Sequence, residues 1–341
     1  MVENTEEEKV ATKVVKMNLS ENNYVVKSNK FLELKRNIEF SVLEEKLLLA
    51  LISEIRLEDE DFCEYDFKIK DFLELTNIDN RGKVYKDIHN AARTLAGTLI
   101  DLEEDGNPVA ITFLSYAKTI KNKGIIKLRF EPTLKPYLLS LQKKFTRYQL
   151  KNILKLKANY SIRLYELLKQ NLVMRYRVFE IEDLKELLGI PGKYEKVYDF
   201  KKNVIEKALE EINEYTNISV TYDQEKTGRR VTHFRFKIKP QFEDDEAKII
   251  EKLYTKDQIE DLKEKCGLTD KKVSGKQLFE LYNLAVEKTD HLDDVDVYQY
   301  FRLNLAYTEE KNPKNFIAYL KKALKDDYSN AVIILKYKDK I

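Results

Sequence analysis

An internal repeat is the feature that most constrains the fold of this chain. The segment FKIKDFLEL, which begins at Phe67, returns as FEIEDLKEL beginning at Phe179, 112 positions later. The segment KVYKD at Lys83 returns as KVYDF at Lys196 with an offset of 113 positions, and one residue inserted in the turn around Pro191 accounts for the difference. Such a repeat indicates two copies of one supersecondary unit, and it has to be recognised before a fold class is assigned.

Each copy has the pattern of a helix, a strand, two helices and a hairpin. In the first copy Ser41 and Glu44 form a capping box that starts a buried helix. The strand-like segments VAITFLSYA and GIIKLRF flank a turn at residues 118–124, and ISVTYD and THFRFKI flank a turn at residues 225–230 in the second copy. This is the element order of a winged helix, so we expect two tandem winged-helix domains.

The segments outside the repeat have a different character. Residues 1–23 are polar and lack a clear period, which predicts a loose tail. Beyond an acidic linker at residues 240–247, Ser274 with Gln277 and Pro313 mark the starts of helices. We therefore expect an α+β, helix-rich chain made of a flexible tail (1–23), a first winged-helix domain (24–144), a second winged-helix domain (145–240) and a small all-helical C-terminal domain with its acidic linker (241–341).

The composition predicts a soluble, cytoplasmic protein. Hydrophobic residues make up 43% of the 341 residues and charged residues 35%, and no apolar run is long enough to cross a bilayer. Acidic residues stand at positions 6–8, where a secretory signal would carry basic ones. The 2 cysteines, Cys63 and Cys266, lie far apart without a metal-binding spacing, so we expect reduced thiols.

Positive charge is concentrated in the middle of the chain. Residues 145–240 hold 20 Lys and Arg against 13 Asp and Glu, whereas residues 241–341 hold 18 against 21. A polyanion would therefore bind the middle segment.

The segment 145–170 combines this charge with a strongly helical pattern of apolar residues. Thr146 and Gln149 fit a capping box, and we expect two consecutive helices here. The basic side chains off the apolar stripe include Arg147, Lys151 and Arg163. A buried helix pair with a solvated basic face would explain the same pattern.

FTRYQL and YSIRLYELLK in this segment resemble the signature of the iteron-binding replication initiators of theta-replicating plasmids, a family with twin winged-helix domains. In that family this segment begins the second winged helix, and the resemblance covers roughly residues 24–240. It implies a protein that binds repeated sites (iterons) in the double-stranded DNA of its origin, opens the origin, and recruits the host initiator and helicase machinery. It also implies a homodimer in equilibrium with a monomer, dimerisation through the first domain, and repression of its own gene.

The last helix before the hairpin of a winged helix enters the DNA major groove, and the hairpin touches the backbone or the minor groove. The side chains on the outward face of this helix in the second copy can pair with bases or phosphates, and they are Lys196, Lys201, Lys202, Asn203 and Glu206. The offset of 113 transfers the outward positions to the first copy, where they are Lys86, His89, Asn90 and Arg93.

Both hairpins are basic, which suits contacts with phosphates. We expect DNA contacts in the first hairpin from Lys118, Lys121 and Lys123, and in the second from Lys226, Arg229, Arg230 and Arg235. A run of charge is usually only a solvated face, but two runs at equivalent positions favour DNA binding.

Catalysis finds little support in the sequence. The 3 histidines, His89, His233 and His291, show no metal-ligand spacing, and no Gly-rich phosphate loop is present. We expect no enzyme, no cofactor and no metal. Two other functions fit the same pattern: a winged-helix transcriptional regulator, and a replisome scaffold that acts through the C-terminal helical domain.

Overall fold

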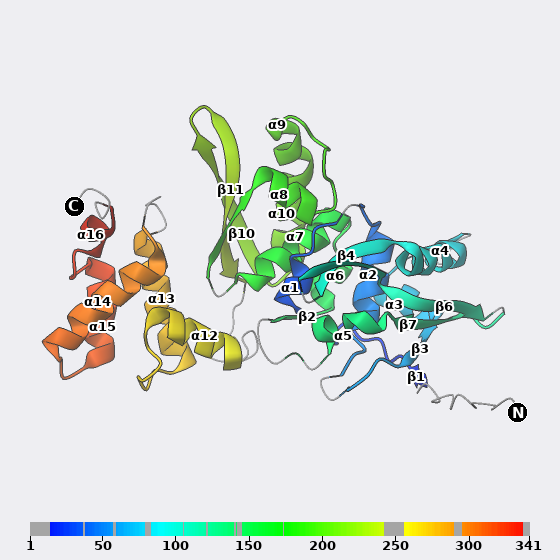
Figure 1. Cartoon of the computed structure of the whole chain (residues 1–341), viewed down its shortest axis with the longest axis horizontal. Helices are drawn as coiled ribbons and strands as arrows, with labels where there is room; N and C mark the ends of the chain where they lie inside the picture. The colour runs from blue at the N-terminus through cyan, green and yellow to red at the C-terminus, as the bar shows by residue number, and fades with distance from the viewer. Residues whose placement is uncertain are drawn as a thin grey trace, which may run out of the picture. The chain divides into compact units, whose positions relative to one another are not determined.

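The chain forms two compact units. The computed structural model (Figure 1) describes residues 14–36, 38–56, 59–78, 83–104, 106–120, 122–139, 141, 145–172, 174–241, 256–289 and 295–336. The first unit comprises residues 1–170 and 178–236, and the second comprises residues 171–177 and 237–341. Nearly all of both winged helices lies in the first unit, and the C-terminal helices lie in the second.

The first winged helix follows the predicted order of elements. Its parts are β3 (Glu64–Lys68), α3 (Ile69–Thr76), α4 (Val84–Gly97), β6 (Leu114–Ile120) and β7 (Ile125–Phe130). Helix α2 (Val42–Ile52) precedes it and begins with the predicted capping box, in which Ser41 and Glu44 bond each other's backbone amides. The sheet order is β1-β3-β7-β6, where β1 (Val14–Lys16) runs parallel to β3.

The second winged helix repeats this plan. Its parts are β9 (Tyr176–Glu180), α8 (Ile181–Leu187), α9 (Val197–Phe200), the π-helical turn η2 (Lys201–Ile205), α10 (Glu206–Tyr215), β10 (Ile218–Thr227) and β11 (Arg230–Pro240). In each copy the first strand pairs with the last strand of the hairpin, as β3 with β7 and β9 with β11. Phe67 and Phe179 therefore occupy equivalent strands, which confirms the two winged helices predicted from the repeat.

Alternation of side chains explains why the hairpins form where they do. In β7 the buried residues are Ile126, Leu128 and Phe130, and in β11 they are Phe234, Phe236 and Ile238. Every second side chain thus faces the core, while the basic residues between them face outward. Glycines with positive φ, Gly124 and Gly228, complete the two turns.

The helix predicted at residues 145–149 is wrong. This segment forms strand β8 (Phe145–Gln149), which pairs antiparallel with β2 (Tyr24–Ser28), and the helices begin only after it, as α6 (Lys151–Leu154) and α7 (Asn159–Gln170). Thr146 donates its hydroxyl to Asn29 Oδ1 (2.8 Å) instead of capping a helix. The ladder to a partner more than a hundred residues away supplies backbone hydrogen bonds that the local pattern does not reveal.

Two further differences concern element boundaries. An additional hairpin, β4 (Leu99–Glu104) and β5 (Asn107–Thr112), precedes β6, and buried Phe113 separates β5 from β6 within the expected strand VAITFLSYA. Helix α15 (Phe316–Asp326) is capped by the side chain of Asn315, so Pro313 lies before the helix and not in its first turn.

The second unit is helical in the residues described. Its helices are α12 (Lys256–Cys266), α13 (Gly275–Thr289), α14 (Val297–Lys311), α15 and α16 (Ala331–Lys336). Ser274 and Gln277 form the predicted cap, and Gly267 ends α12 with a φ of +75°. Arg175 Nε donates to Asn283 Oδ1 (2.9 Å), which ties residues 171–177 to these helices. The acidic linker lies mostly outside the described residues.

Buried charges hold the first unit together around α7. Lys27 on β2 forms an ion pair with Glu166, and Arg163 lies 3.6 Å from the second carboxylate oxygen of Glu166. The Arg163 guanidinium also donates to the carbonyls of Leu32, Leu34 (3.0 Å) and Leu187 (3.1 Å). Since Leu187 ends α8, one arginine ties β2 and its neighbours to the second winged helix.

Burial and neighbouring charges shift the pKa values of this cluster in opposite directions. Burial raises the pKa of Glu166, but the charges of Lys27 and Arg163 outweigh it and hold that pKa below its usual value. Burial lowers the pKa of Lys27 to about 8 despite the nearby carboxylate. Glu166 is therefore ionised, and its charge is matched by cations on both sides.

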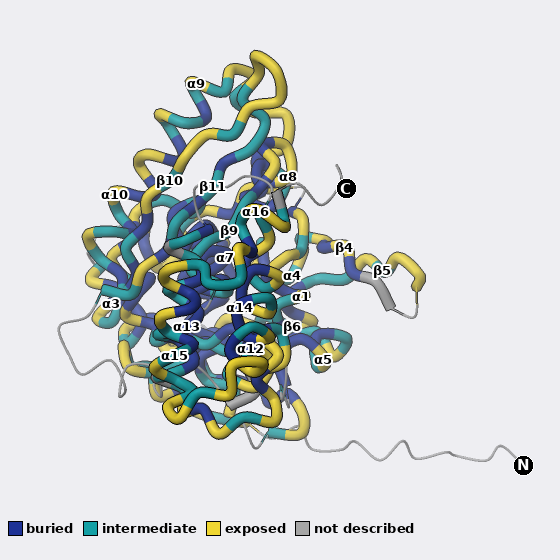
Figure 2. The backbone as a smooth tube through the Cα atoms, turned by 90° about the vertical axis from the view of Figure 1, so that its left-hand side faces the viewer, coloured by how far each residue is buried: buried dark blue, intermediate teal, exposed yellow. Residues whose placement is uncertain are grey.

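In the part of the chain that the structure describes, no helix is long and apolar enough to cross a membrane. Cys63 and Cys266 are both buried, and neither forms a disulfide. Figure 2 shows buried residues along α7 and exposed residues around α9 and along the outer part of β10.

Glu166→Gln should destabilise the protein strongly. It leaves Lys27 and Arg163 buried without their carboxylate, and breaking a buried pair costs about 3–5 kcal/mol. Urea unfolding of both proteins at pH 7 measures the loss. Glu74→Gln is the matched control, because its pair with Lys70 is exposed and should be worth no more than about 1 kcal/mol. Equal losses in the two variants would contradict the proposed role of the cluster.

Lys169→Met should stabilise the protein, and the gain should shrink as pH rises. The Lys169 ammonium has no hydrogen-bond partner among the described residues, and burial lowers its pKa to about 7. The unfolded chain keeps this proton up to about pH 10, so wild-type stability rises relative to the variant by at most about 1.4 kcal/mol per pH unit between those values. Urea unfolding between pH 6 and 10 measures the difference. A difference that does not change with pH would contradict this reading, and Lys155→Met, at an exposed lysine, is the control.

Candidate nucleic-acid interface

The recognition helix of the second winged helix has one apolar and one polar face. Phe200, Val204, Ala208 and Ile212 are buried as predicted. The outward residues Lys196, Lys202 and Glu206 are exposed, and Lys201 and Asn203 are half-buried. The outward residues on α9, η2 and α10 are thus at least partly accessible, and their contact with DNA stays a prediction.

A π-helical turn interrupts this helix at residues 201–205, where three of the predicted DNA contacts stand. The wider turn inserts one residue into the helical spacing, and such turns occur frequently at functional sites. It leaves Val204 and Ile205 buried while Lys202 remains exposed. The turn thus fits a long helix to the core without turning its polar side chains inward.

Glu206 is held by its neighbours. Tyr222 on β10 donates its hydroxyl to Glu206 Oε1 (3.3 Å), and Lys201 Nζ lies 3.8 Å from the same oxygen. Burial, followed by the nearby carboxylate, raises the pKa of Tyr222 to about 12, so the phenol stays protonated and donates. The carboxylate is thereby oriented, with its second oxygen left for a donor such as a cytosine amino group.

The hairpin of the second winged helix ends in exposed cations. Lys226, Arg229 and Arg230 are exposed at its tip, and the tip reaches the same end of the unit as α9 (Figures 1 and 2). Arg235, in contrast, is half-buried and pairs with Glu225 through an Nε–Oε1 distance of 2.5 Å. The tip is therefore the part of the hairpin that offers cations to phosphates.

The first winged helix presents a similar surface. Lys86, Asn90 and Arg93 on α4 are exposed, as are Lys118 and Lys123 on the hairpin. His89 is half-buried, and its Nδ1 lies 2.5 Å from the hydroxyl of Thr119 on β6. This contact joins the recognition helix to the hairpin. Lys121 lies outside the described residues.

Arg163 was predicted to contact DNA, and the structure contradicts this. The residue is 1% exposed, and its guanidinium donates to backbone carbonyls and lies 3.6 Å from the carboxylate of Glu166. The sequence pattern placed it off the apolar stripe, but residues of other elements, among them Leu32, Leu34 and Leu187, cover that side of α7. Lys151 is exposed, at the start of α6.

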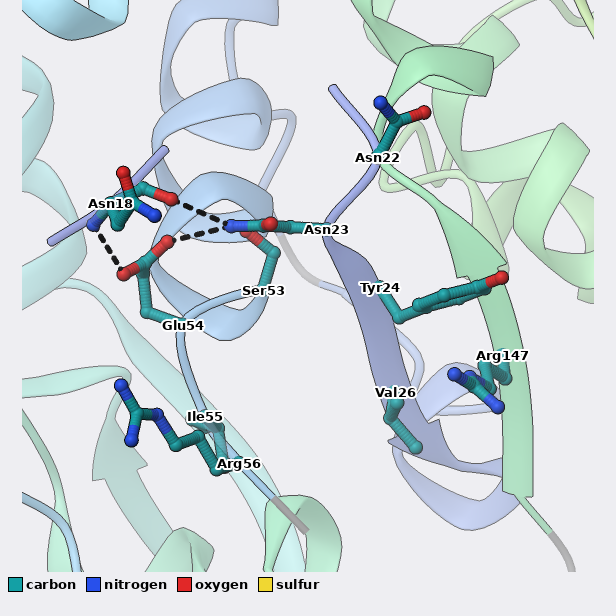
Figure 3. Close-up of a pocket in the computed structure, with 10 residues that line it drawn as sticks. All are labelled: Asn18, Asn22, Asn23, Tyr24, Val26, Ser53, Glu54, Ile55, Arg56 and Arg147. Atoms are coloured by element: carbon teal, nitrogen blue, oxygen red, sulfur yellow. Dashed lines mark hydrogen bonds between the residues drawn. The ribbon is translucent and has the colours of Figure 1, made fainter. Parts of the chain in front are cut away.

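Arg147 lies in a pocket away from both recognition helices. Its guanidinium stacks on the ring of Tyr24, 3.6 Å from the ring centroid, across the β2–β8 pair. Figure 3 shows this pair on one side of a pocket of about 390 Å³, with Glu54 opposite, bound to Asn18 and Asn23. The predicted basic residues of the 145–170 segment therefore do not form one surface.

Two exposed tyrosines on the recognition helices were not predicted from the sequence. Tyr85 and Tyr198 are the second residues of α4 and α9, and they are 39% and 62% exposed. The signal was present in the repeated letters KVY, which contain both. Lys202 Nζ lies 6.0 Å from the centre of the Tyr198 ring, so this tyrosine belongs to the same surface.

Among the described residues, no group of three or more His, Cys, Asp or Glu side chains could hold a metal ion. His291 lies outside the described residues. The chemistry that the surface offers is hydrogen bonding and charge: amide, ammonium, guanidinium and carboxylate groups on two helices, flanked by two basic hairpins.

Two family models match the chain. The one described as "Initiator Replication protein, WH1" matches residues 24–169, and the one described as "Initiator Rep protein, WH2" matches residues 180–238. The first match includes β8 and α7, in keeping with the pairing of β8 with β2.

Individual proteins give the same result. The PI protein of Escherichia coli is 32% identical over 133 residues, which cover 34% of this chain and 44% of that protein. A replication initiation protein of Escherichia coli is 25% identical over 182 residues, 50% of this chain and 55% of that protein. The chain thus spans about half the length of these relatives.

A solved structure shares the fold. The crystal structure of the Pi initiator protein in complex with iteron DNA superposes with a TM-score of 0.53 at 23% identity, covering 66% of this chain and 100% of that chain. Because both winged helices match the family models and have the fold that the models describe, this chain belongs to the family of initiator replication proteins with two winged-helix domains.

Proposed function

We propose that this protein binds repeated sites in the duplex DNA of a plasmid origin and starts replication there. The observation that carries the proposal is that one compact unit holds two winged helices, each with a polar recognition helix beside a hairpin with exposed cations. A structural relative with the same fold is described in complex with iteron DNA, which supports iterons as the target.

The later steps are proposed on the family resemblance. The protein opens the origin, recruits the host initiator and helicase, and represses its own gene as a dimer in equilibrium with the monomer. We also propose the division into a tail (1–23), two winged-helix domains (24–144 and 145–240) and a C-terminal domain (241–341), the last of which contacts host proteins. Its excess of acidic residues makes it a poor partner for DNA.

Footprinting on the DNA that flanks its own gene tests the proposal. The purified protein should protect a series of similar sites, spaced by about 10–10.5 bp or a multiple, because each copy has to present the same face of the duplex. A plasmid carrying that DNA should replicate only when the protein is supplied. Protection of one unrepeated site, without replication, would favour a transcriptional regulator.

Arg229→Ala with Arg230→Ala should weaken binding to all DNA. Both side chains are exposed at the hairpin tip, where they reach phosphates that every sequence has. Losing two phosphate contacts should reduce the slope of log K against log salt by about two. Binding to cognate and scrambled duplexes over a salt series measures both effects. A change confined to the cognate duplex would contradict this assignment.

Asn203→Ala or Glu206→Ala should lower affinity for the cognate repeat alone. A lost base contact costs about 1–3 kcal/mol, which is roughly a 5- to 150-fold change in the dissociation constant. Binding to random duplex should hardly change. Glu214→Ala is the control, since Glu214 is exposed near the opposite end of α10. Equal losses on cognate and random duplexes would show that these side chains do not read bases.

A further inference from the structure

A cavity beside the hairpin of the first winged helix has no role in the contacts described so far. It has a volume of about 790 Å³ and lies between the junction of β3 with α3 and the tip of the β6–β7 hairpin. Lys68, Lys70 and Lys123 line it, together with Tyr85 from the first turn of α4. The cavity thus adjoins both elements of this winged helix that are expected to face DNA.

Two contacts hold the walls of this cavity in place. The backbone amide of Ile69, the first residue of α3, donates to the carbonyl of Gly124 at the hairpin tip (3.0 Å). The ring of Tyr85 lies against the same glycine, since a Cβ added to Gly124 would stand 3.4 Å from Tyr85 Cε1. Gly124 also has a φ of +61°, which favours glycine. The shape of the cavity is therefore built into the fold and needs no ligand to form.

The charge that faces the cavity is mainly positive. Lys68 Nζ lies 3.7 Å from Asp71, which also lines the cavity, and Lys70 Nζ lies 3.7 Å from Glu74. Both are exposed pairs at long distance, which are worth little and are readily exchanged for a stronger partner. The lysine side chains are 50% and 77% exposed, so they are able to reach a polyanion.

The second winged helix carries the opposite charge at the same positions. The offset of 112 that aligns Phe67 with Phe179 also aligns Lys68 with Glu180 and Lys70 with Glu182. Glu182 pairs with Lys185 at 2.8 Å. Two equivalent junctions in one protein therefore differ in sign, while the strand and helix on either side keep the same order.

We propose that this cavity receives the sugar-phosphate backbone of duplex DNA, with Lys68, Lys70 and Lys123 bound to phosphates and Tyr85 against a sugar. The proposal rests on the proposed function, because it assumes that α4 approaches the major groove. A phosphodiester is the ligand that suits several lysines around an open, preformed groove, since each ammonium is a compact charge with three donors. Contact with the backbone gives affinity and position without reading sequence.

The strand–helix junction of the first winged helix can thereby bind the DNA backbone, and the junction of the second winged helix cannot. With Lys123 on the hairpin and Lys68 and Lys70 at the strand–helix junction, its cations lie on two sides of one groove. In the second winged helix exposed cations lie at the hairpin tip and on the recognition helix, whereas the junction is acidic. The first copy thus adds sequence-independent contacts at its strand–helix junction to those that the second copy makes at its hairpin tip.

The test compares two charge-neutralised forms of the full-length protein. One carries Lys68→Gln with Lys70→Gln, and the matched control carries Glu180→Gln with Glu182→Gln at the equivalent positions. Binding of each to a random duplex and to the protected duplex is measured over a salt series. The lysine variant should bind both duplexes roughly tenfold more weakly at low salt, with the salt slope reduced by about two. The glutamate variant should bind as well as the wild type or better.

Several outcomes would overturn the proposal. Unchanged affinity and slope in the lysine variant would show that these lysines do not touch DNA. A loss confined to the protected duplex with an unchanged slope would show that they read bases. An equal loss in both variants would show a general effect on folding, and circular dichroism of each variant checks the fold directly. If the wild type itself protects no repeats, the proposed function fails instead, while binding to the random duplex still reports on the cavity.

Discussion

The ion cluster on α7 is the interaction on which the rest of the first unit depends. Glu166 and Arg163 are one turn apart on a helix whose residues are almost all buried, so both charges have to find partners inside. Lys27 on β2 forms an ion pair with Glu166. The guanidinium of Arg163 donates to the carbonyls of Leu32, Leu34 and Leu187. An apolar core could stabilise as much, but it would tolerate a shifted register. Charges that are satisfied in one arrangement favour that arrangement over others.

Buried polar contacts also join the two winged helices to each other. Arg163 bonds to the end of α8, and the backbone amide of Arg36 donates to the carbonyl of Glu186 on the same helix (3.0 Å). Arg36 in turn pairs with Glu45 on α2. The two winged helices are thus joined through buried polar groups and not through a flexible linker alone. Under the proposed function, two recognition helices held in one unit would select DNA in which both sites have a fixed spacing.

The sequence was sufficient where the pattern is local or repeated. The offset between Phe67 and Phe179 predicted both winged helices, because the same pattern of residues occurs twice. Ser41 with Glu44 predicted the start of α2, because the two residues of a capping box lie within one turn of each other. It failed where the partner is remote. The pairing of β8 with β2 spans more than a hundred residues, so the local helical pattern at Thr146 was misleading. Arg163 was misplaced for the same reason, since only the folded chain shows which layer covers its side of α7.

Of the predicted contacts on the recognition helices and hairpin tips, most are exposed, because outward positions follow from helical and strand periodicity.

Duplication explains why similar folds present different chemistry. Most positions that keep the fold are buried and apolar in both copies, as with Phe67 and Phe179, Ile69 and Ile181, or Phe72 and Leu184. Outward positions carry no such constraint. Where the first copy has Lys68 and Lys70, the second copy has Glu180 and Glu182, so the charge is reversed. A charge on an exposed surface changes the free energy of folding very little, whereas it changes the affinity for a polyanion directly. Two copies of one unit can therefore keep a common core while their surfaces differ, with lysines at the strand–helix junction of the first and, in the second, a recognition helix whose Glu206 accepts from Tyr222.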